Sequence, residues 1–84
     1  MNKYLVTIIV PIIETEYDVY IPNNKKIGTI KTLILKTLNE LTNNSFSKTI
    51  DQVRMLDRDT SMEYDNNMYV KDAGIKNGSM IVIM

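Results

Sequence analysis

The sequence predicts an α+β fold, in which one amphipathic helix packs on one face of a mixed β-sheet, the β-grasp architecture. Three observations predict it. Two apolar stretches, residues 4–10 and 80–84, lie near opposite ends of the chain and have the pattern of central strands. A single amphipathic pattern, residues 27–41, lies between them. A right-handed crossover through that helix makes the two apolar strands parallel neighbours.

Length and composition predict a single domain over residues 1–84. A chain of 84 residues is too short to divide into two domains and long enough for one modest core. Hydrophobic residues make up 44% of it and charged residues 24%, which is typical of a folded protein and not of a disordered tail.

Charge and residue types exclude several functions. Ten basic residues balance ten acidic ones, so no overall field attracts nucleic acid or anionic lipid. The chain has no Cys and no His, and so lacks the side chains of Cys–His and Ser–His–Asp nucleophilic systems, of thiolate and imidazole metal sites, and of a His proton shuttle. We therefore expect no catalytic residues, no cofactor, no metal and no nucleic-acid partner. The absence of Cys suits a reducing cytoplasm.

The first residues, MNKYLVTIIVPII, are similar to a signal peptide in placing one Lys before an apolar run. However, the run is rich in β-branched residues, contains Pro11 and has no small-residue cleavage site. It is also shorter than the ~20 residues that a membrane span needs. We interpret it as a buried strand and expect no membrane insertion.

The first two strands are expected to form a hairpin. Residues 4–10 are apolar on both sides, as in a strand in the middle of a sheet. Residues 17–21 alternate between apolar and polar and end at Pro22, which indicates a half-buried strand. Residues 13–16 provide the turn between them.

The helix follows directly. Asn23 and Asn24 are expected to supply its capping amide. Gly28 weakens the first turn by up to ~1 kcal/mol, which favours a late start. Asn43 and Asn44 are expected to end the helix, because Asn tolerates the left-handed conformation. The apolar stripe consists of Ile27, Ile30, Ile34, Leu38 and Leu41.

The second half predicts shorter strands. Residues 45–51 are interpreted as an irregular connection, and residues 52–56 as a third strand. A short fourth strand is expected near residues 62–64, and the continuously apolar residues 80–84 form the last strand. In the third strand, Val53 and Met55 are on one side, and Arg54 and Leu56 on the other.

Two motifs resemble ubiquitin-like domains. The end of the chain reads Val70-x-Asp72-x-x-Ile75-x-x-x-Ser79-x-Ile81-x-Ile83, which resembles the approach to the last strand of such domains. The helix reads Ile27-x-x-Ile30-Lys31-x-x-Ile34, which looks like the ubiquitin helix. The resemblance implies a ubiquitin-like β-grasp fold over most of the chain.

A closer resemblance rests on Tyr17-Asp18-Val19-Tyr20-Ile21-Pro22, on Ile27, and on the Leu- and Ile-rich residues 30–38. This resemblance is to the YukD/EsaB family of small bacterial ubiquitin-like proteins. It implies a cytosolic accessory of type VII (WXG100) secretion that contacts a membrane-anchored subunit non-covalently. The Asn-, Lys- and Ile-rich composition suits an AT-rich Gram-positive source. The long connection over residues 42–50 and Gly28 at the helix start depart from the family pattern.

The alternative is a ubiquitin-like modifier or a sulfur carrier. Such relatives project a flexible Gly-Gly tail past the last strand, which an activating enzyme adenylates. The sequence here reads MIVIM to its last residue, Met84, without Gly. We therefore expect recognition without covalent conjugation.

An uncovered apolar face is the predicted binding site. If Ile81 and Ile83 face the helix, the alternate residues of the last strand face the other side, where the sequence provides no second helix. Such a surface fits a protein partner, or self-association of the sheet face. The predicted patch, with one residue added from the helix, is Arg54, Leu56, Met80, Val82, Met84 and Leu35.

Charged clusters are interpreted as solvated. The acidic group, Asp57, Asp59, Glu63 and Asp65, lacks the spacing of a calcium loop. Lys25, Lys26 and Lys36 are assigned to exposed faces, although Lys25 and Lys26 flank a helix start, which favours anions. Lys31 borders the apolar stripe, so we expect its stem to be partly buried and its ammonium paired with a carboxylate.

Overall fold

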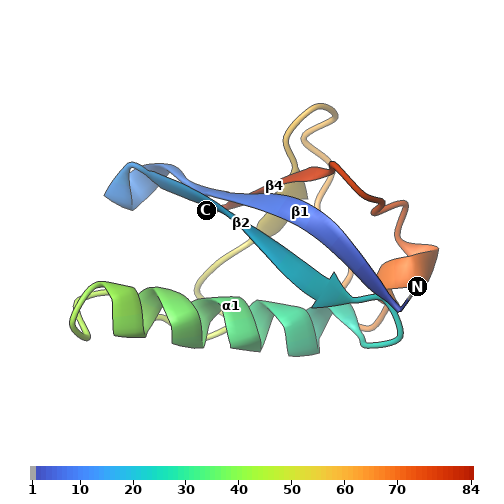
Figure 1. The fold of residues 1–84 in the computed structure, drawn as a ribbon. Helices are drawn as coiled ribbons and strands as arrows, with labels where there is room; N and C mark the ends of the chain where they lie inside the picture. Colours follow the sequence, from blue (N-terminus) through green and yellow to red (C-terminus); the bar gives the residue numbers. More distant parts are fainter. Residues whose placement is uncertain (1) are drawn as a thin grey trace.

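A computed structural model describes residues 2–84 and has the predicted β-grasp architecture (Figure 1). The sheet has the strand order β2-β1-β4-β3. As predicted, β1 and β2 form an antiparallel hairpin, and β1 and β4 are parallel; β4 and β3 are antiparallel. The elements in chain order are β1 (Lys3–Val10), the 3-10 helix η1 (Pro11–Ile13), β2 (Thr15–Pro22), α1 (Ile27–Leu41), β3 (Met55–Asp57), the 3-10 helix η2 (Val70–Asp72) and β4 (Met80–Ile83).

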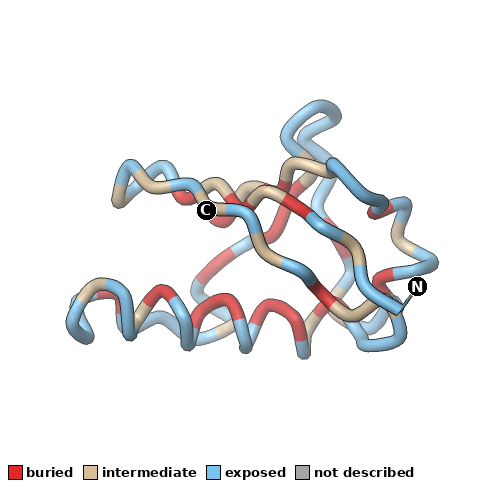
Figure 2. The backbone as a smooth tube through the Cα atoms, in the orientation of Figure 1, coloured by how far each residue is buried: buried red, intermediate tan, exposed pale blue. Residues whose placement is uncertain are grey.

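The core fills the space between α1 and one face of the sheet. Buried residues follow the side of α1 that faces the strands (Figure 2). Ile81 and Ile83 are 0% and 1% exposed, which confirms that they face the helix, while Met80 and Val82 between them are only partly buried. Alternate residues of β4 therefore face the helix and the opposite side of the sheet, as the sequence predicts.

The third and fourth strands differ from the prediction. The third strand is Met55–Asp57 instead of residues 52–56. Arg54 still exchanges two backbone hydrogen bonds of 2.9 Å with Met84, but the Gln52 amide donates to the Thr49 carbonyl in a turn, which shortens the strand. The predicted strand at residues 62–64 is wrong, because it is reduced to one bridge between Leu56 and Glu63.

The helix start also corrects the prediction. The N-cap is Lys26, without a side-chain cap, so Asn23 and Asn24 do not cap the helix, and α1 begins at Ile27 despite Gly28. Backbone carbonyls from a distant loop do the capping: the Ile27 amide donates to Met68 O at 2.8 Å, and the Gly28 amide to Asn66 O at 2.9 Å. Amides of Thr29 and Ile30 donate to Lys26 O. The amides of the first three helical residues, Ile27, Gly28 and Thr29, thus all have backbone acceptors, so these donors are not available to an anion.

Gly28 permits this close approach. A Cβ added at position 28 would lie 3.2 Å from Asn66 O, a backbone atom held by its own hydrogen bond to Gly28. We expect Gly28→Ala to lower the free energy of unfolding by about 1 kcal/mol, although Ala normally stabilises a helix relative to Gly by about that amount. Chemical denaturation measures the change. Thr37→Ala, an exposed position further along the same helix, is the control and should be neutral or stabilising; a stabilised Gly28→Ala variant would contradict the capping geometry.

The helix ends as predicted, with one exception. Asn43 and Asn44 have φ of 53° and 67°, the left-handed conformation that ends helices. Leu41, predicted to be part of the apolar stripe, is 63% exposed. It lies in the last turn, where the chain leaves the helix for the irregular residues 42–54, so the buried stripe stops at Leu38.

Candidate functional site

The candidate site is the outer face of the sheet, turned away from α1. The strand register places Ile9 beside Val82 and Val82 beside Leu56, so that apolar residues of β1, β4 and β3 form one row. Met80 and Met84 flank Val82 on the same side of β4. Within residues 2–84, α1 covers the opposite face only (Figure 1). Met84 is 64% exposed, and Met80, Val82 and Ile9 are half-buried.

Leu56 does not belong to the exposed part of this face, which corrects the prediction. It is only 7% exposed, yet it lies outside the main core cluster. Glu63 stands opposite it across the isolated bridge, and Arg54 precedes it by two residues on the same side. Arg54 Nε and Glu63 Oε1 form an ion pair of 3.0 Å, and the register places Leu56 between Val82 and Glu63.

Ile9 is the residue that sequence reasoning missed. The alternation of residues 4–10 places Leu5 and Ile9 on the side opposite the core, but it does not say which strand lies beside them. The register with β4 decides this, and it puts Ile9 next to Val82. The outer-face site is therefore Ile9, Met80, Val82 and Met84, with Arg54 at its border.

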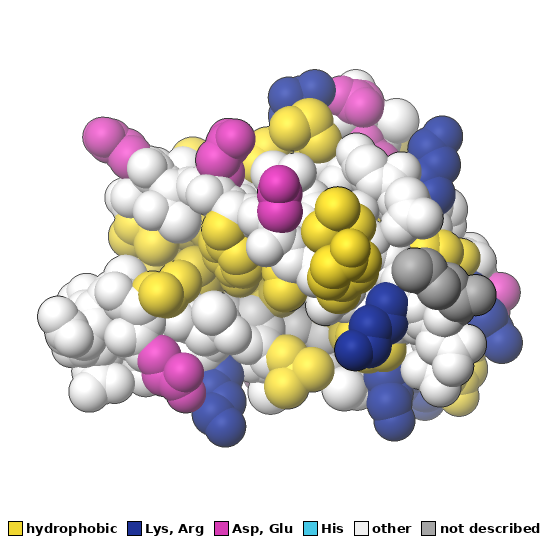
Figure 3. Space-filling view, in the orientation of Figure 1, with side chains coloured by type: hydrophobic (Ala, Val, Ile, Leu, Met, Phe, Trp, Pro, Cys, Tyr) yellow, Lys and Arg dark blue, Asp and Glu magenta, His cyan; other side chains and the backbone are white. Residues whose placement is uncertain are grey.

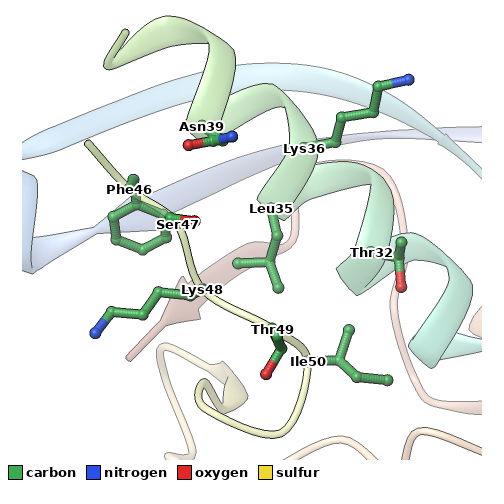
Figure 4. A pocket seen from close by; sticks show the side chains of 9 residues that line it. All are labelled: Thr32, Leu35, Lys36, Asn39, Phe46, Ser47, Lys48, Thr49 and Ile50. Carbon is green, nitrogen blue, oxygen red and sulfur yellow. The ribbon is translucent and has the colours of Figure 1, made fainter. Parts of the chain in front are cut away.

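Leu35, the helix residue predicted to be exposed, is 5% exposed and belongs to the core cluster. The segment after α1 covers it, and Phe46 and Ile50 lie on its side of the helix (Figure 4). The long connection over residues 42–50 thus has a packing role. Leu33, 51% exposed, and Leu41, 63% exposed, are apolar residues that this helix presents to solvent instead.

The pocket beside Leu35 has a volume of about 320 Å³ and no arrangement for acid–base chemistry. The ends of Lys36 and Lys48 point away from it (Figure 4). The Asn39 Oδ1 atom is buried without a hydrogen-bond partner among the described residues. A water molecule would satisfy this atom, and the pocket is best described as a packing gap under the covering segment.

A second hollow, of about 480 Å³, adjoins the end of β4. Ile12, 76% exposed, and Met84 form part of its lining, together with Val53 and Ile83. Lys48 is the one ionisable residue that lines it within residues 2–84. The hollow shares Met84 with the outer-face side of β4, but its Val53 and Ile83 belong to the core cluster on the helix side, and it offers no chemistry of its own.

Lys31 is buried, as expected, but its partner is not a carboxylate. The residue is 2% exposed, and its Nζ donates to Asn66 Oδ1 at 3.3 Å. The prediction of an ion pair is therefore wrong: an amide oxygen from the loop that caps α1 takes the place of the carboxylate. The role is structural, since this contact joins the helix to that loop.

The acidic group forms a hydrogen-bonded turn, as predicted. Asp57 Oδ1 accepts the amides of Asp59 and Thr60 at 2.7 and 3.1 Å. The Tyr64 hydroxyl donates to Asp57 Oδ2 at 3.3 Å, and Arg58 pairs with Asp59 at 3.3 Å. In the part of the chain that the structure describes, no three His, Cys, Asp or Glu residues are placed to hold a metal ion.

This turn gives a pH-dependent contribution to stability. The amide of Thr60, then that of Asp59, lowers the pKa of Asp57, so its contribution is complete above the unfolded pKa of about 3.9 and is lost as the pH falls through the lower folded pKa. Burial, and then the charge and hydrogen bond of Asp57, raises the pKa of Tyr64 to about 12. Its contribution is complete below the unfolded pKa of about 10 and is lost as the pH rises toward 12.

We expect Asp57→Asn to lose less stability than the wild type on acidification below about pH 4, and Tyr64→Phe to lose less between about pH 10 and 12. Urea denaturation across the pH range measures the free energy of unfolding in both the acid and the alkaline range. Tyr64→Phe is the control for the acid range, because it keeps the two backbone donors of Asp57. Asp57→Asn should also reduce the loss of stability above about pH 10, because Asp57 contributes to the raised pKa of Tyr64. Identical acid limbs for Asp57→Asn and the wild type would contradict the turn geometry.

The fold and this surface define a class: a ubiquitin-like β-grasp domain with an uncovered apolar sheet face. No family model matches the chain, and no curated protein matches it in sequence. Solved structures do match. The ubiquitin-like domain of the type VII secretion protein EccD1 from Mycobacterium tuberculosis has a TM-score of 0.76 and 17% identity, over 100% of this chain and 99% of that one.

Two further type VII structures are similar. The EccD5 ubiquitin-like domain from Mycobacterium xenopi has a TM-score of 0.77 and 11% identity, over 100% of this chain and 94% of that one. A chain of the MycP5-free ESX-5 inner membrane complex has a TM-score of 0.78 and 10% identity, and this chain spans 21% of it. At these identities the likeness establishes the ubiquitin-like fold. No helix in residues 2–84 has both the length and the apolar character that crossing a membrane requires.

Proposed function

We propose that this protein is a non-catalytic, ubiquitin-like binding module of the YukD/EsaB type, a cytoplasmic accessory of a type VII (WXG100) secretion system. It acts by non-covalent contact between its outer face and a membrane-anchored subunit of the secretion machinery. The observation that carries the proposal is the apolar surface of Ile9, Val82 and Met84 on a sheet face that no helix of the described chain covers. Exposed apolar area bordered by charge is the usual character of a docking surface.

The type VII pathway is supported by the fold comparisons. Two of the matched domains are the ubiquitin-like domains of EccD proteins, and a third match is part of an inner membrane complex. The sequence motif of residues 17–22 supports the same pathway independently. We infer that the present chain supplies a ubiquitin-like surface to a comparable machine.

Site-specific photocrosslinking tests the proposal. A photoreactive amino acid at position 82, in the middle of the outer face, is expected to capture a membrane-anchored type VII subunit in cells that contain the system. Met84→Asp should abolish the crosslink, because a carboxylate on an apolar docking surface is desolvated without a partner. Leu56 is unsuitable for this test because it is buried. Glu14→Lys, at an exposed position after η1, is the matched control and should leave the crosslink intact.

Three outcomes contradict the proposal. Capture of a second copy of this chain alone would assign the outer face to self-association. An unchanged crosslink in Met84→Asp would exclude the face as the docking site. Light-independent, denaturant-resistant conjugates that form through the C-terminal carboxylate would support the modifier or sulfur-carrier alternative.

A further inference from the structure

β2 has an open edge. It is the first strand of the sheet order, so one of its sides pairs with β1 and the other has no strand beside it in the described chain (Figure 1). With the bounds Thr15–Pro22 it is as long as β1 and much longer than β3, the strand at the opposite edge. A long open edge is a template for an added strand unless its residues prevent it.

The hydrogen bonds of β1 to its two neighbouring strands show which backbone groups of β2 point to the open edge. The Thr7 amide donates to Ser79 O at 3.0 Å, on the β4 side, so the neighbouring amides of β1 face β2. Val6 pairs with Val19, and Ile8 with Tyr17, through those groups. By alternation, the amides and carbonyls of Glu16, Asp18 and Tyr20 point to the open edge, and no described residue bonds to them through the backbone. Pro22, without an amide, ends this row.

An apolar groove runs beside the edge. It lies between β2 and α1, and its lining includes Tyr17, Val19, Leu33 and Thr37. Its volume is about 70 Å³, far below the ~300 Å³ of a small-molecule pocket and suited to an aliphatic side chain. Hydrophobic side chains form a band between the helix and the strands above it, with acidic side chains above the band (Figure 3).

The charge of β2 indicates whether the added strand comes from a second copy of this chain or from another protein. The side chains of Glu16 and Asp18 point to the outer face and are exposed. If two β2 strands paired antiparallel about their centre, these carboxylates would lie opposite or diagonal to one another, and such pairs are destabilising. The edge is therefore protected against its own copies, while a strand with cations at these positions gains two opposite-charge pairs.

We propose that β2 binds an extended segment of another protein by strand addition, with Lys or Arg opposite Glu16 and Asp18 and aliphatic residues over Val19 and Leu33. The backbone groups of the open edge supply the hydrogen bonds, and the groove selects for an apolar residue at alternate positions. This site is centred on the edge of β2 and on the helix side, away from Val82 and Met84, and it adjoins the outer-face site only where Glu16 lies beside Ile9.

A peptide titration followed by NMR tests the proposal. The probe is the peptide Lys-Val-Lys-Ile-Lys-Val-Lys, added to the full chain labelled with ¹⁵N, and the matched control is Glu-Val-Glu-Ile-Glu-Val-Glu. The Lys peptide is expected to shift the amides of Glu16, Asp18 and Tyr20 and to slow their hydrogen exchange. The Glu peptide should bind at least about tenfold more weakly, because its charges repel the edge carboxylates.

Variants separate the three components of the proposed site: the backbone groups of the open edge, the apolar groove and the carboxylates. Asp18→Pro removes a free amide and leaves the ladder to β1 intact; it should lose the peptide, whereas Asp18→Asn should keep the backbone contacts. Leu33→Asp changes an exposed residue of the groove and should also abolish peptide binding. It keeps the proposal testable if Asp18→Pro does not fold. Changing Glu16 and Asp18 together to Lys should reverse the preference between the two peptides. Val82→Asp should bind as the wild type does.

Four results would overturn the proposal: equal binding of the two peptides, shifts confined to Val82 and Met84, undiminished binding by Leu33→Asp, or concentration-dependent protection of the β2 edge by the chain itself. Loss of the outer-face crosslink at position 82 with retained peptide binding would refute the proposed function alone.

Discussion

Ile81→Ala is expected to lower the free energy of unfolding by about 2–5 kcal/mol, the range for removing a fully buried aliphatic side chain. Ile81 is 0% exposed, and it lies on β4 between β1 and β3, pairing with Ile8 and Asp57. Little can collapse into the space it leaves, because both neighbours are fixed by the ladder. For a domain of this size, such a loss is a large part of the total stability.

Val82→Ala is the matched control, since it lies next to Ile81 on the same strand and points to the other face. It is expected to cost less than about 1 kcal/mol. Urea denaturation with a common m-value measures both changes. Equal costs for the two variants would show that both sides of β4 are covered, which would refute the uncovered outer face.

Asn66→Ala is expected to lower the free energy of unfolding by about 1–3 kcal/mol, because it leaves a buried ammonium without its partner. Lys31 is 2% exposed, and Asn66 Oδ1 accepts its hydrogen bond at 3.3 Å. Removing a single partner costs the desolvation of the group left behind, whereas removing both together costs much less.

A double-mutant cycle isolates this contact. Lys31→Met keeps the buried stem and removes the charge, so it should be much less destabilising than Asn66→Ala. In the Lys31→Met background, Asn66→Ala should cost less than it does alone, which gives a coupling energy of about 1 kcal/mol or more. Asn67→Ala, in the same loop with an exposed side chain, is the control. Additive effects of the two changes would mean that the ammonium has another partner.

Together these contacts explain how the loop of residues 64–69 matters to the helix. Its backbone carbonyls cap α1 through Ile27 and Gly28, and its Asn66 side chain holds Lys31 one turn later. The loop is polar and has no regular structure, so its sequence alone gives no sign of this role. We expect changes in it to affect helix stability although they lie outside the helix.

The sequence by itself determined what depends on periodicity. The alternation at Ile81 and Ile83 and the helical stripe from Ile27 to Leu38 specify which sides are buried, because a strand repeats every two residues and a helix every 3.6. They also determined the hairpin and the parallel pair β1–β4, since chain order and handedness leave few other topologies.

The tertiary structure alone decided what depends on neighbours distant in the chain. It placed Ile9 beside Val82, placed Leu56 between Val82 and Glu63, covered Leu35 with Phe46, and gave Lys31 an amide partner. No periodic pattern in the sequence predicts these contacts, because each one joins two segments that are separated along the chain by loops. Whether an apolar residue is a binding surface or a core residue is therefore a property of the folded chain.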